Sequence, residues 1–181
     1  MSRLRITDPS RRKYKVAAIV GLIAGFFSAI VKFGWEVPFP PRTPERNATN
    51  PPQELLEQLG MSPEASHTTI GFNGNDLPIY SFIIHFGFAI FFALLYCLLA
   101  EKYPQIKLWM GAAFGLFLWV FFHVVVMPAM GTVPAPWDQP FEEHFSEALG
   151  HMLWLWSIEI VRRDLRSRIT RDPDPEVEIA A

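Results

Sequence analysis

Three ionisable side chains lie close together in an otherwise apolar segment of the sequence. In EEHFSEALGHMLWLWSIEI, residues 142–160, His144, Glu147 and His151 are separated by three and four positions. On an α-helix these spacings place all three within about 60° of one another. Imidazole and carboxylate groups so placed can exchange protons, and they are also suitable ligands for Zn, Fe or Cu. The segment therefore predicts a polar face on a membrane-like helix.

Ionisable residues occur at a matching depth in the other apolar segments. His85 lies about six residues into one segment, and His123 lies about seven residues before the end of another. Because lipid exposure of such groups costs several kcal/mol, we expect them to face the interior of a helix bundle. They would form one layer roughly 5–10 Å below the outer membrane edge, made of Lys32, Glu36, His85, His123, Glu147 and His151. The alternative is that each histidine is an isolated, hydrogen-bonded structural residue.

The composition is that of a small membrane protein. Half of the 181 residues are hydrophobic, and they include 16 Phe and 6 Trp, more than a soluble domain of this size usually needs. Four segments are apolar and approach or exceed the roughly 20 residues that a bilayer requires; they are residues 16–36, 79–100, 108–130 and 145–161. The fourth is the weakest, because it contains Glu147, His151 and Glu159.

The distribution of basic residues predicts the topology. If all four segments span, 13 of the 16 Lys and Arg lie on the side that holds both termini, as the positive-inside rule requires. With three spans, the five arginines after residue 161 would lie outside. We therefore expect an all-α, four-helix transmembrane bundle with cytoplasmic N- and C-termini. A cleaved signal peptide is the alternative for the first segment, but no clear small-x-small cleavage site follows it.

The remaining residues are predicted to be loops around this single membrane domain, residues 1–181. Residues 37–77 are rich in Pro and polar groups and would form a periplasmic loop, with one short helix at Gln53–Leu59 after Pro51-Pro52. Residues 171–181 are acidic and contain two prolines, which predicts a disordered cytoplasmic tail.

Small residues recur at a spacing that favours close helix packing. Gly21 and Gly25 in the first span, and Gly111 and Gly115 in the third, each lie four positions apart. Such pairs let helix backbones approach each other in lipid. Lys32 and Glu36 continue the first of these faces outward, either as an ion pair or as two separate anchors at the membrane interface.

Several stretches resemble a known family. RRKYKVAAIVGLIAGFFSAIVKFGWEVPFPPR, AEKYPQIKLWMG and GHMLWLWSIEIVRRDLRSRITRDPDPE are similar to the YagU-type inner membrane proteins of proteobacteria. The similarity covers most of the chain and weakens over residues 43–77. It implies a multi-pass inner membrane protein. It implies no catalytic residues, because the family has no settled biochemical activity.

Motifs for soluble enzyme chemistry are missing. The sequence has no Gly-rich phosphate loop, no His-Glu-x-x-His and no Gly-x-Ser-x-Gly. Its only cysteine, Cys97, excludes an intrachain disulfide, and a net charge of −2 gives no reason to expect nucleic acid as a partner. We therefore expect a non-catalytic protein of the bacterial inner membrane.

Three functions remain open. The first is a pH-responsive His/Glu layer that handles protons or ions, for example in adaptation of the envelope to acid. The second is an accessory subunit that docks a membrane protein partner, or a second copy of the chain, through Gly-rich helix faces. The third is a haem- or metal-binding protein, although no set of metal ligands is assigned. In this scheme Glu159 is separate from the layer and makes a weak interfacial contact with Arg162 or Arg163.

Overall fold

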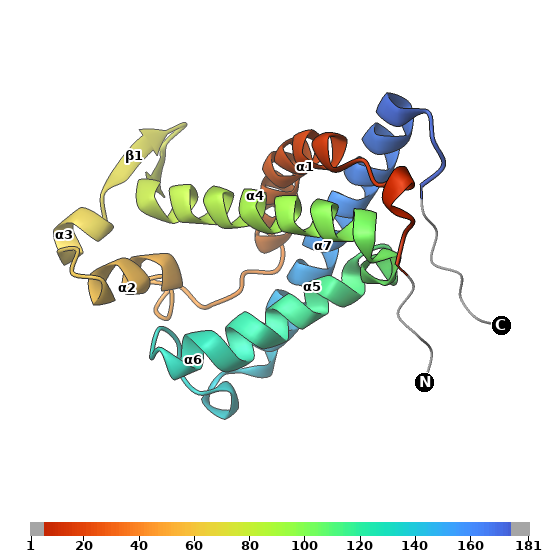
Figure 1. The fold of residues 1–181 in the computed structure, drawn as a ribbon. Coiled ribbons are helices and arrows are strands. Elements are labelled where there is room, and N and C mark those ends of the chain that lie inside the picture. The colour runs from red at the N-terminus through yellow and green to blue at the C-terminus, as the bar shows by residue number, and fades with distance from the viewer. Residues whose placement is uncertain (1–5, 175–181) are drawn as a thin grey trace.

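Four long helical segments make up most of the structure, a computed structural model that describes residues 6–174 (Figure 1). The first, second and fourth are continuous helices, α1 (Tyr14–Glu36), α4 (Ile79–Lys102) and α7 (Phe141–Thr170). The third is composite: α5 (Ala112–Trp119) continues as a π-helix, η3 (Val120–Val126), and ends in α6 (Met127–Ala129). The all-α prediction is confirmed for this main body of the chain.

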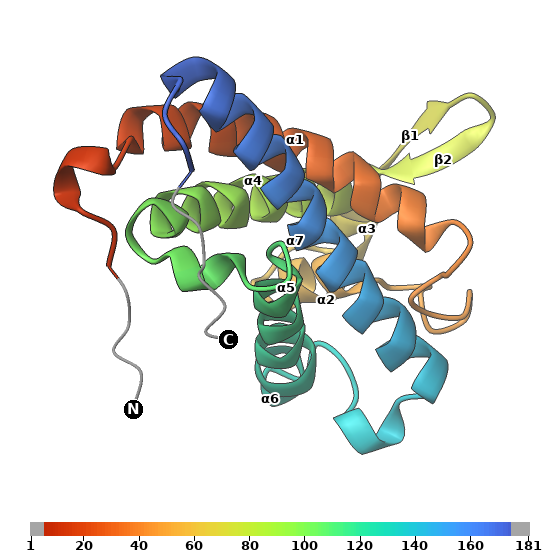
Figure 2. The same cartoon turned by 90° about the vertical axis from the view of Figure 1, so that its right-hand side faces the viewer.

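Short elements connect the long helices. Three are 3₁₀ turns, η1 (Pro9–Arg11), η2 (Pro104–Lys107) and η4 (Pro136–Asp138). Between α1 and α4 lie α2 (Pro51–Gln58), α3 (Pro63–Ser66) and an antiparallel hairpin of β1 (Thr69–Phe72) and β2 (Asn75–Pro78). The predicted short helix is confirmed as α2, which starts at Pro51 because Asn50 and Gln53 form a capping box. The hairpin was not predicted, and it projects from the bundle (Figure 2).

The long segments run between two ends of the bundle. The terminal end contains η1, η2 and the last turns of α7, and the Thr7 N–H donates to the Lys102 carbonyl there. The loop end contains residues 37–78 and the connection between α6 and α7 (Figure 1). In the bundle α1 packs on both α4 and α7, and α5 packs on α7. Each long segment therefore runs in the opposite direction to the one before it.

Three of these segments are long and apolar enough to cross a membrane: Tyr14–Glu36, Ile79–Lys102 and Ala112–Ala129. The segment α7 is longer than any of them but carries charges along its length, as its sequence indicated. It runs between the same two ends as the other three (Figure 2). The four-span topology and the cytoplasmic position of both termini stay predictions.

The first pair of predicted packing glycines lies where two helices approach closely. A Cβ atom added to Gly21 would lie 2.9 Å from the Cα atom of Leu94, and one added to Gly25 would lie 2.6 Å from the Cα atom of Ile90. Both neighbours are backbone atoms of α4, which cannot move aside as a side chain could. These glycines therefore set the distance between α1 and α4.

The second pair behaves differently from the prediction. Gly111 is not within the third helix, because Trp109, Met110 and Gly111 all have positive φ and the helix starts only at Ala112. Gly115 lies against the backbone carbonyl of His151 and so packs on α7. Gly111 also lies close to α7, since an added Cβ would lie 3.0 Å from the Leu155 carbonyl oxygen. Both glycines therefore pack on the fourth segment, although Gly111 does so from a turn and not from within the helix.

The π-helix in the third segment has a local cause. Pro128 has no backbone N–H to donate to the Val124 carbonyl, so the α-helical ladder cannot continue unaltered. The wider π turn of Val120–Val126 precedes this proline and contains His123. Because a π turn rotates the residues within it relative to an α-helix, a regular helical projection of the sequence could not give the direction of His123.

Candidate functional site: an ion-paired histidine and glutamate cluster

Glu147 is the centre of a buried polar cluster in the loop half of the bundle. One of its carboxylate oxygens, Oε2, lies 3.2 Å from Lys32 Nζ, and the other, Oε1, lies 3.5 Å from an Arg42 nitrogen. Two imidazoles are near the same Oε2 atom, with His123 Nε2 at 3.7 Å and His151 Nδ1 at 3.6 Å. The Glu147 side chain is 8% exposed, so these four groups replace most of its hydration.

The last turns of α1 supply the first cation. Lys32 is buried and also pairs with Glu36 at 2.6 Å, one helical turn further on. Trp35 donates from Nε1 to the Ser146 carbonyl at 3.0 Å, which fixes this end of α1 against α7. Gly150 makes room for both side chains, because an added Cβ would lie 2.9 Å from the Trp35 ring and 3.2 Å from Lys32 Cε.

The loop after α1 supplies two further cations that sequence analysis did not select. Arg42 reaches Glu147, and Arg46 makes two hydrogen bonds to Glu143, of 2.5 and 2.9 Å. Glu143 and Glu147 lie one turn apart on α7, so the two arginines tie the loop to that helix. One feature of the sequence could have identified these arginines: they are the only two Lys or Arg residues in the predicted periplasmic loop.

The two imidazoles of the cluster come from different helices and meet directly. The rings of His123 and His151 lie 4.8 Å apart, edge to face. His151 Nδ1 lies 2.8 Å from the Glu147 carbonyl; since a carbonyl oxygen only accepts, this nitrogen carries the proton. The structure thus brings together five of the six predicted layer residues, which are Lys32, Glu36, His123, Glu147 and His151.

The sixth predicted residue, His85, makes no contact with Glu147. Its ring stacks on Phe33 at 4.0 Å, and its Nε2 atom donates to the Ala29 carbonyl at 3.2 Å. His144, in the same row of α7 as Glu147, also points elsewhere and bonds to the Pro136 carbonyl at 2.8 Å. These two histidines have the structural, hydrogen-bonded role that was the alternative interpretation for each histidine.

Three residues of the cluster have side chains of the kinds that bind metal ions. His123, Glu147 and His151 each place one ligand atom within 4.8 Å of the others, and two imidazoles with one carboxylate suit Zn or Fe. However, both oxygens of Glu147 already face a cation, and an added metal ion would lie close to Lys32 and Arg42. Their positive charges oppose it, so the arrangement is that of a paired carboxylate.

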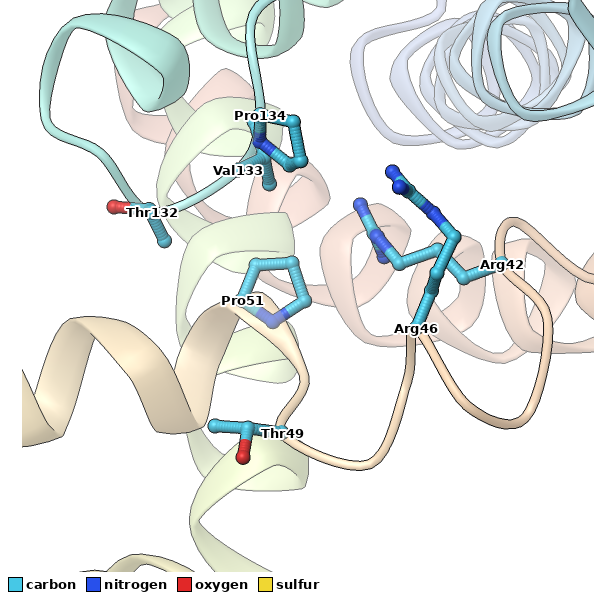
Figure 3. A pocket seen from close by; sticks show the side chains of 7 residues that line it. All are labelled: Arg42, Arg46, Thr49, Pro51, Thr132, Val133 and Pro134. Carbon is cyan, nitrogen blue, oxygen red and sulfur yellow. The ribbon is translucent and has the colours of Figure 1, made fainter. Parts of the chain in front are cut away.

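A cavity of about 560 Å³ opens beside the cluster. Lys32, His85, His123 and His151 line it, together with aromatic and aliphatic side chains of α4, η3 and α6 and residues of the loop after α1. A smaller pocket of about 210 Å³ shares Arg42, Pro51 and Thr132 with it. Figure 3 shows Arg42 and Arg46 side by side at this pocket, opposite Thr132, Val133 and Pro134.

A second charge cluster, at the terminal end, was not expected. Glu159 and Arg162 are each 1% exposed and hydrogen-bond at 2.6 and 2.8 Å, and Tyr96 donates to Glu159 at 2.9 Å. Arg166 pairs with buried Glu101 at 2.5 Å. The predicted contact of Glu159 with Arg162 is thus confirmed, but the pair is buried among helices and is not the weak interfacial contact that was expected.

The start of the predicted disordered tail joins this terminal cluster. Asp174 accepts hydrogen bonds from Arg162 at 2.6 Å and from Lys107 at 2.7 Å. Burial alone would raise the pKa of Asp174, but these two cations outweigh it and lower the pKa to about 2. Burial lowers the pKa of Lys107, although Asp174 opposes that shift. Residues 175–181 of the tail lie outside the described residues.

Comparison with known proteins identifies the family. Residues 26–160 match the family described as "Protein of unknown function (DUF1440)". The chain is 41% identical over 196 aligned residues to inner membrane protein YagU of Escherichia coli (strain K12), an alignment that covers 97% of this chain and 96% of that protein. No solved structure matches the chain. The relative and the three apolar helices confirm the predicted inner-membrane location. The chain thus belongs to the DUF1440 family of membrane proteins, as its resemblance to the YagU-type proteins predicted.

Proposed function

We propose that this protein is a non-catalytic, pH-responsive component of the inner membrane, and that its four long segments span the bilayer with the loop end in the periplasm. The charge asymmetry of the sequence supports this orientation. In it the Glu147 cluster lies beneath the periplasmic surface, where the pH follows that of the environment. The function would be to convert acidification into a change of the loop that follows α1.

The observation that carries this proposal is the set of four nitrogen groups around Glu147. Lys32 and Arg42 are permanent cations at neutral pH, whereas His123 and His151 are neutral or charged depending on protonation. With neutral imidazoles the formal charges balance, because Lys32 and Arg42 face Glu36 and Glu147. A proton taken up by either imidazole leaves one uncompensated positive charge in a buried site.

Such a site would relieve the excess charge by releasing its most weakly held cation. Arg42 has the longer ion pair to Glu147, 3.5 Å against 3.2 Å for Lys32, and it belongs to a loop at the edge of the bundle. Lys32 is further held by Glu36. We therefore propose that an imidazolium replaces Arg42 beside Glu147, which frees the loop from α7 at that point. His85 lines the adjoining cavity and His144 points away from the cluster, and both keep their carbonyl partners.

A non-catalytic role fits the same geometry. Glu147 is buried and neutralised by two cations, and so is not free to act as a general base. The glycine faces that an accessory subunit would use are covered within the chain, since Gly21 and Gly25 face α4 and Gly115 faces α7. Docking of a partner or a second copy would therefore have to use other surfaces.

Distance measurements between spin labels would test the proposal. One label replaces Glu45 in the loop and the other replaces Glu142 at the start of α7; both positions are exposed, while native Cys97 is fully buried. At pH 7.5 we expect one narrow distance distribution, and at pH 5 a broader and longer one. The variant His123→Phe/His151→Leu should lose the change, whereas His67→Gln, in the loop but outside the cluster, should keep it. A distribution that does not depend on pH would exclude the proposed function.

A further inference from the structure

The cavity beside the cluster lies between two membrane helices and the loop that follows α1. α4 and α5 are joined through η2 at the terminal end and diverge toward the loop end (Figure 1). Their contact near mid-length is made by aromatic side chains, with the rings of Phe88 and Phe122 5.0 Å apart and those of Phe92 and Phe122 5.4 Å apart. Beyond these rings Ile84 and Val126 line the cavity from opposite walls. Among the described residues, α4 packs extensively on α1 but makes little contact with η3.

The composition of the walls indicates an amphipathic occupant. Most of the lining is apolar, with Phe82, Phe88, Phe122 and Met127 among its residues, and the volume of about 560 Å³ is typical of a small-molecule site. The ionisable lining residues are His85 and those of the Glu147 cluster, and Asn47, Asn50 and Ser81 add uncharged polar groups. A molecule that fills this space needs a long apolar part and one polar end.

The hydrogen-bond inventory indicates the chemistry of that polar end. His85 and His151 each use one ring N–H to bond a backbone carbonyl, so in the neutral ring the other nitrogen is an acceptor. No residue in the described range 6–174 donates to either acceptor. Lys32 uses two of its three N–H groups, on Glu36 and Glu147. Hydroxyl groups both donate and accept and would satisfy these atoms.

The cations at the cavity are already paired, so the cavity has no preference for a ligand with an anionic head group. Arg42 and Arg46, at the adjoining pocket, are each paired with a glutamate, as is Lys32. A phosphate or carboxylate would have to displace Glu147 or Glu143 from a buried ion pair. We infer that the cavity binds a membrane-dissolved amphiphile with an uncharged, hydroxyl-bearing head, which enters from the bilayer between α4 and η3. This inference goes beyond the proposed pH response and does not depend on it.

Photo-crosslinking at constant pH 7.5 would test the inference. The probe is a monoacylglycerol with a diazirine in its acyl chain, added to the full chain in phospholipid nanodiscs; a fatty acid with the same tail is the charged control. We expect saturable labelling of residues 82–89 and 122–130 by the monoacylglycerol, at least five-fold above the fatty acid. Excess unlabelled monoacylglycerol or a short-chain quinol should displace it, and the more potent competitor would distinguish a glycerolipid from a quinol as the natural source.

Neighbouring residues provide matched variants on both walls. Val126→Trp and Ile84→Trp should fill the cavity and lower labelling at least five-fold. Val125→Trp and Ile83→Trp add the same bulk to residues that are 54% and 59% exposed and do not line the cavity, so labelling should be unchanged. If the Trp variants of both helices lower labelling, misfolding of a single variant does not explain the result. Equal labelling by both probes, or no effect of either cavity variant, would overturn the inference.

Discussion

Lys32 Nζ of α1 lies 3.2 Å from Glu147 Oε2 of α7, and this buried ion pair joins the first and fourth long segments of the chain. Each side chain is only 8% exposed. Charges buried to this extent are costly unless they are paired and hydrogen-bonded. The pair therefore restrains how α1 and α7 pack, and the surrounding groups share one electrostatic environment.

Removing one member of this pair should be more harmful than removing both. Lys32→Met leaves Arg42 as the only permanent cation beside Glu147, and loss of one partner from a buried pair typically costs on the order of 3–5 kcal/mol. Lys32→Met/Glu147→Gln should lose less than the sum of the single variants, because the groups are in contact. The free energy of unfolding in mixed detergent micelles measures this. Lys15→Met, at an exposed position of α1, is the control; strict additivity would show that the pair is not coupled.

Close packing of α1 on α4 predicts the effect of a single methyl group. In Gly25→Ala the new Cβ would lie 2.6 Å from the Ile90 Cα atom, so the helices must separate, with a loss of about 1–3 kcal/mol. Gly34→Ala in the same helix meets no atom within 4 Å and should be neutral or slightly stabilising. The free energy of unfolding of the two variants gives the comparison. Equal stability would mean that Gly25 does not set the helix spacing.

The terminal cluster predicts a stability change at low pH. The folded-state pKa of Asp174 is about 2, below the ordinary value of 3.8. Its stabilising effect is therefore complete above about pH 4 and is lost as the pH falls toward 2. Asp174→Asn should lower the free energy of unfolding by on the order of 2 kcal/mol at pH 7. Between pH 4 and 2 the variant should then lose less stability than the wild type, because it lacks the titrating carboxylate.

Asp164→Asn provides the matched control for that experiment. Asp164 pairs with Arg168 on the exposed face of α7, where such pairs contribute little. Its unfolding free energy should stay within about 0.5 kcal/mol of the wild type. If Asp174→Asn behaved in the same way, the contacts of Asp174 with Arg162 and Lys107 would not contribute to stability.

Reporter fusions would test the four-span topology. The basic residues predict that a reporter active only in the periplasm is silent when fused after Arg171 and active when inserted near Ser62. Such reporters measure the side of the membrane directly in living cells. Activity of the C-terminal fusion would contradict the model in which α7 spans.

The sequence predicted the partners that lie on regular helices. The spacing of Glu147 and His151, and that of Lys32 and Glu36, each correspond to one helical turn, and both pairs meet in the structure. Depth along the spans also predicted that His123 shares their level. Rotation about the helix axis was less predictable: the π turn before Pro128 alters the direction of His123, and the turn at Trp109–Gly111 removes Gly111 from its helix.

Residues outside periodic segments could not be assigned to the site in this way. Arg42 and Arg46 lie in a Pro-rich loop, where no repeat determines the direction of a side chain, yet they contact Glu147 and Glu143. Similarly, the arginines of α7 were interpreted as topology signals. The burial of Arg162 and Arg166 depends on Glu101, which is distant in sequence, and on Asp174, which lies beyond the end of α7, and so required the three-dimensional structure.

The central claim, that imidazoles beside Glu147 take up a proton when the periplasm becomes acid, can be measured at the rings themselves. Nuclear magnetic resonance of ¹⁵N-labelled histidine in nanodiscs distinguishes a neutral ring from an imidazolium, and His123→Gln and His151→Gln assign the signals. Between pH 7.5 and 4.5 we expect the signal of one of these two rings to change to that of an imidazolium. Glu147→Gln should move this transition to lower pH, because the stabilising negative charge is removed. If both rings stay neutral throughout this range, the protein does not respond to acid through this cluster.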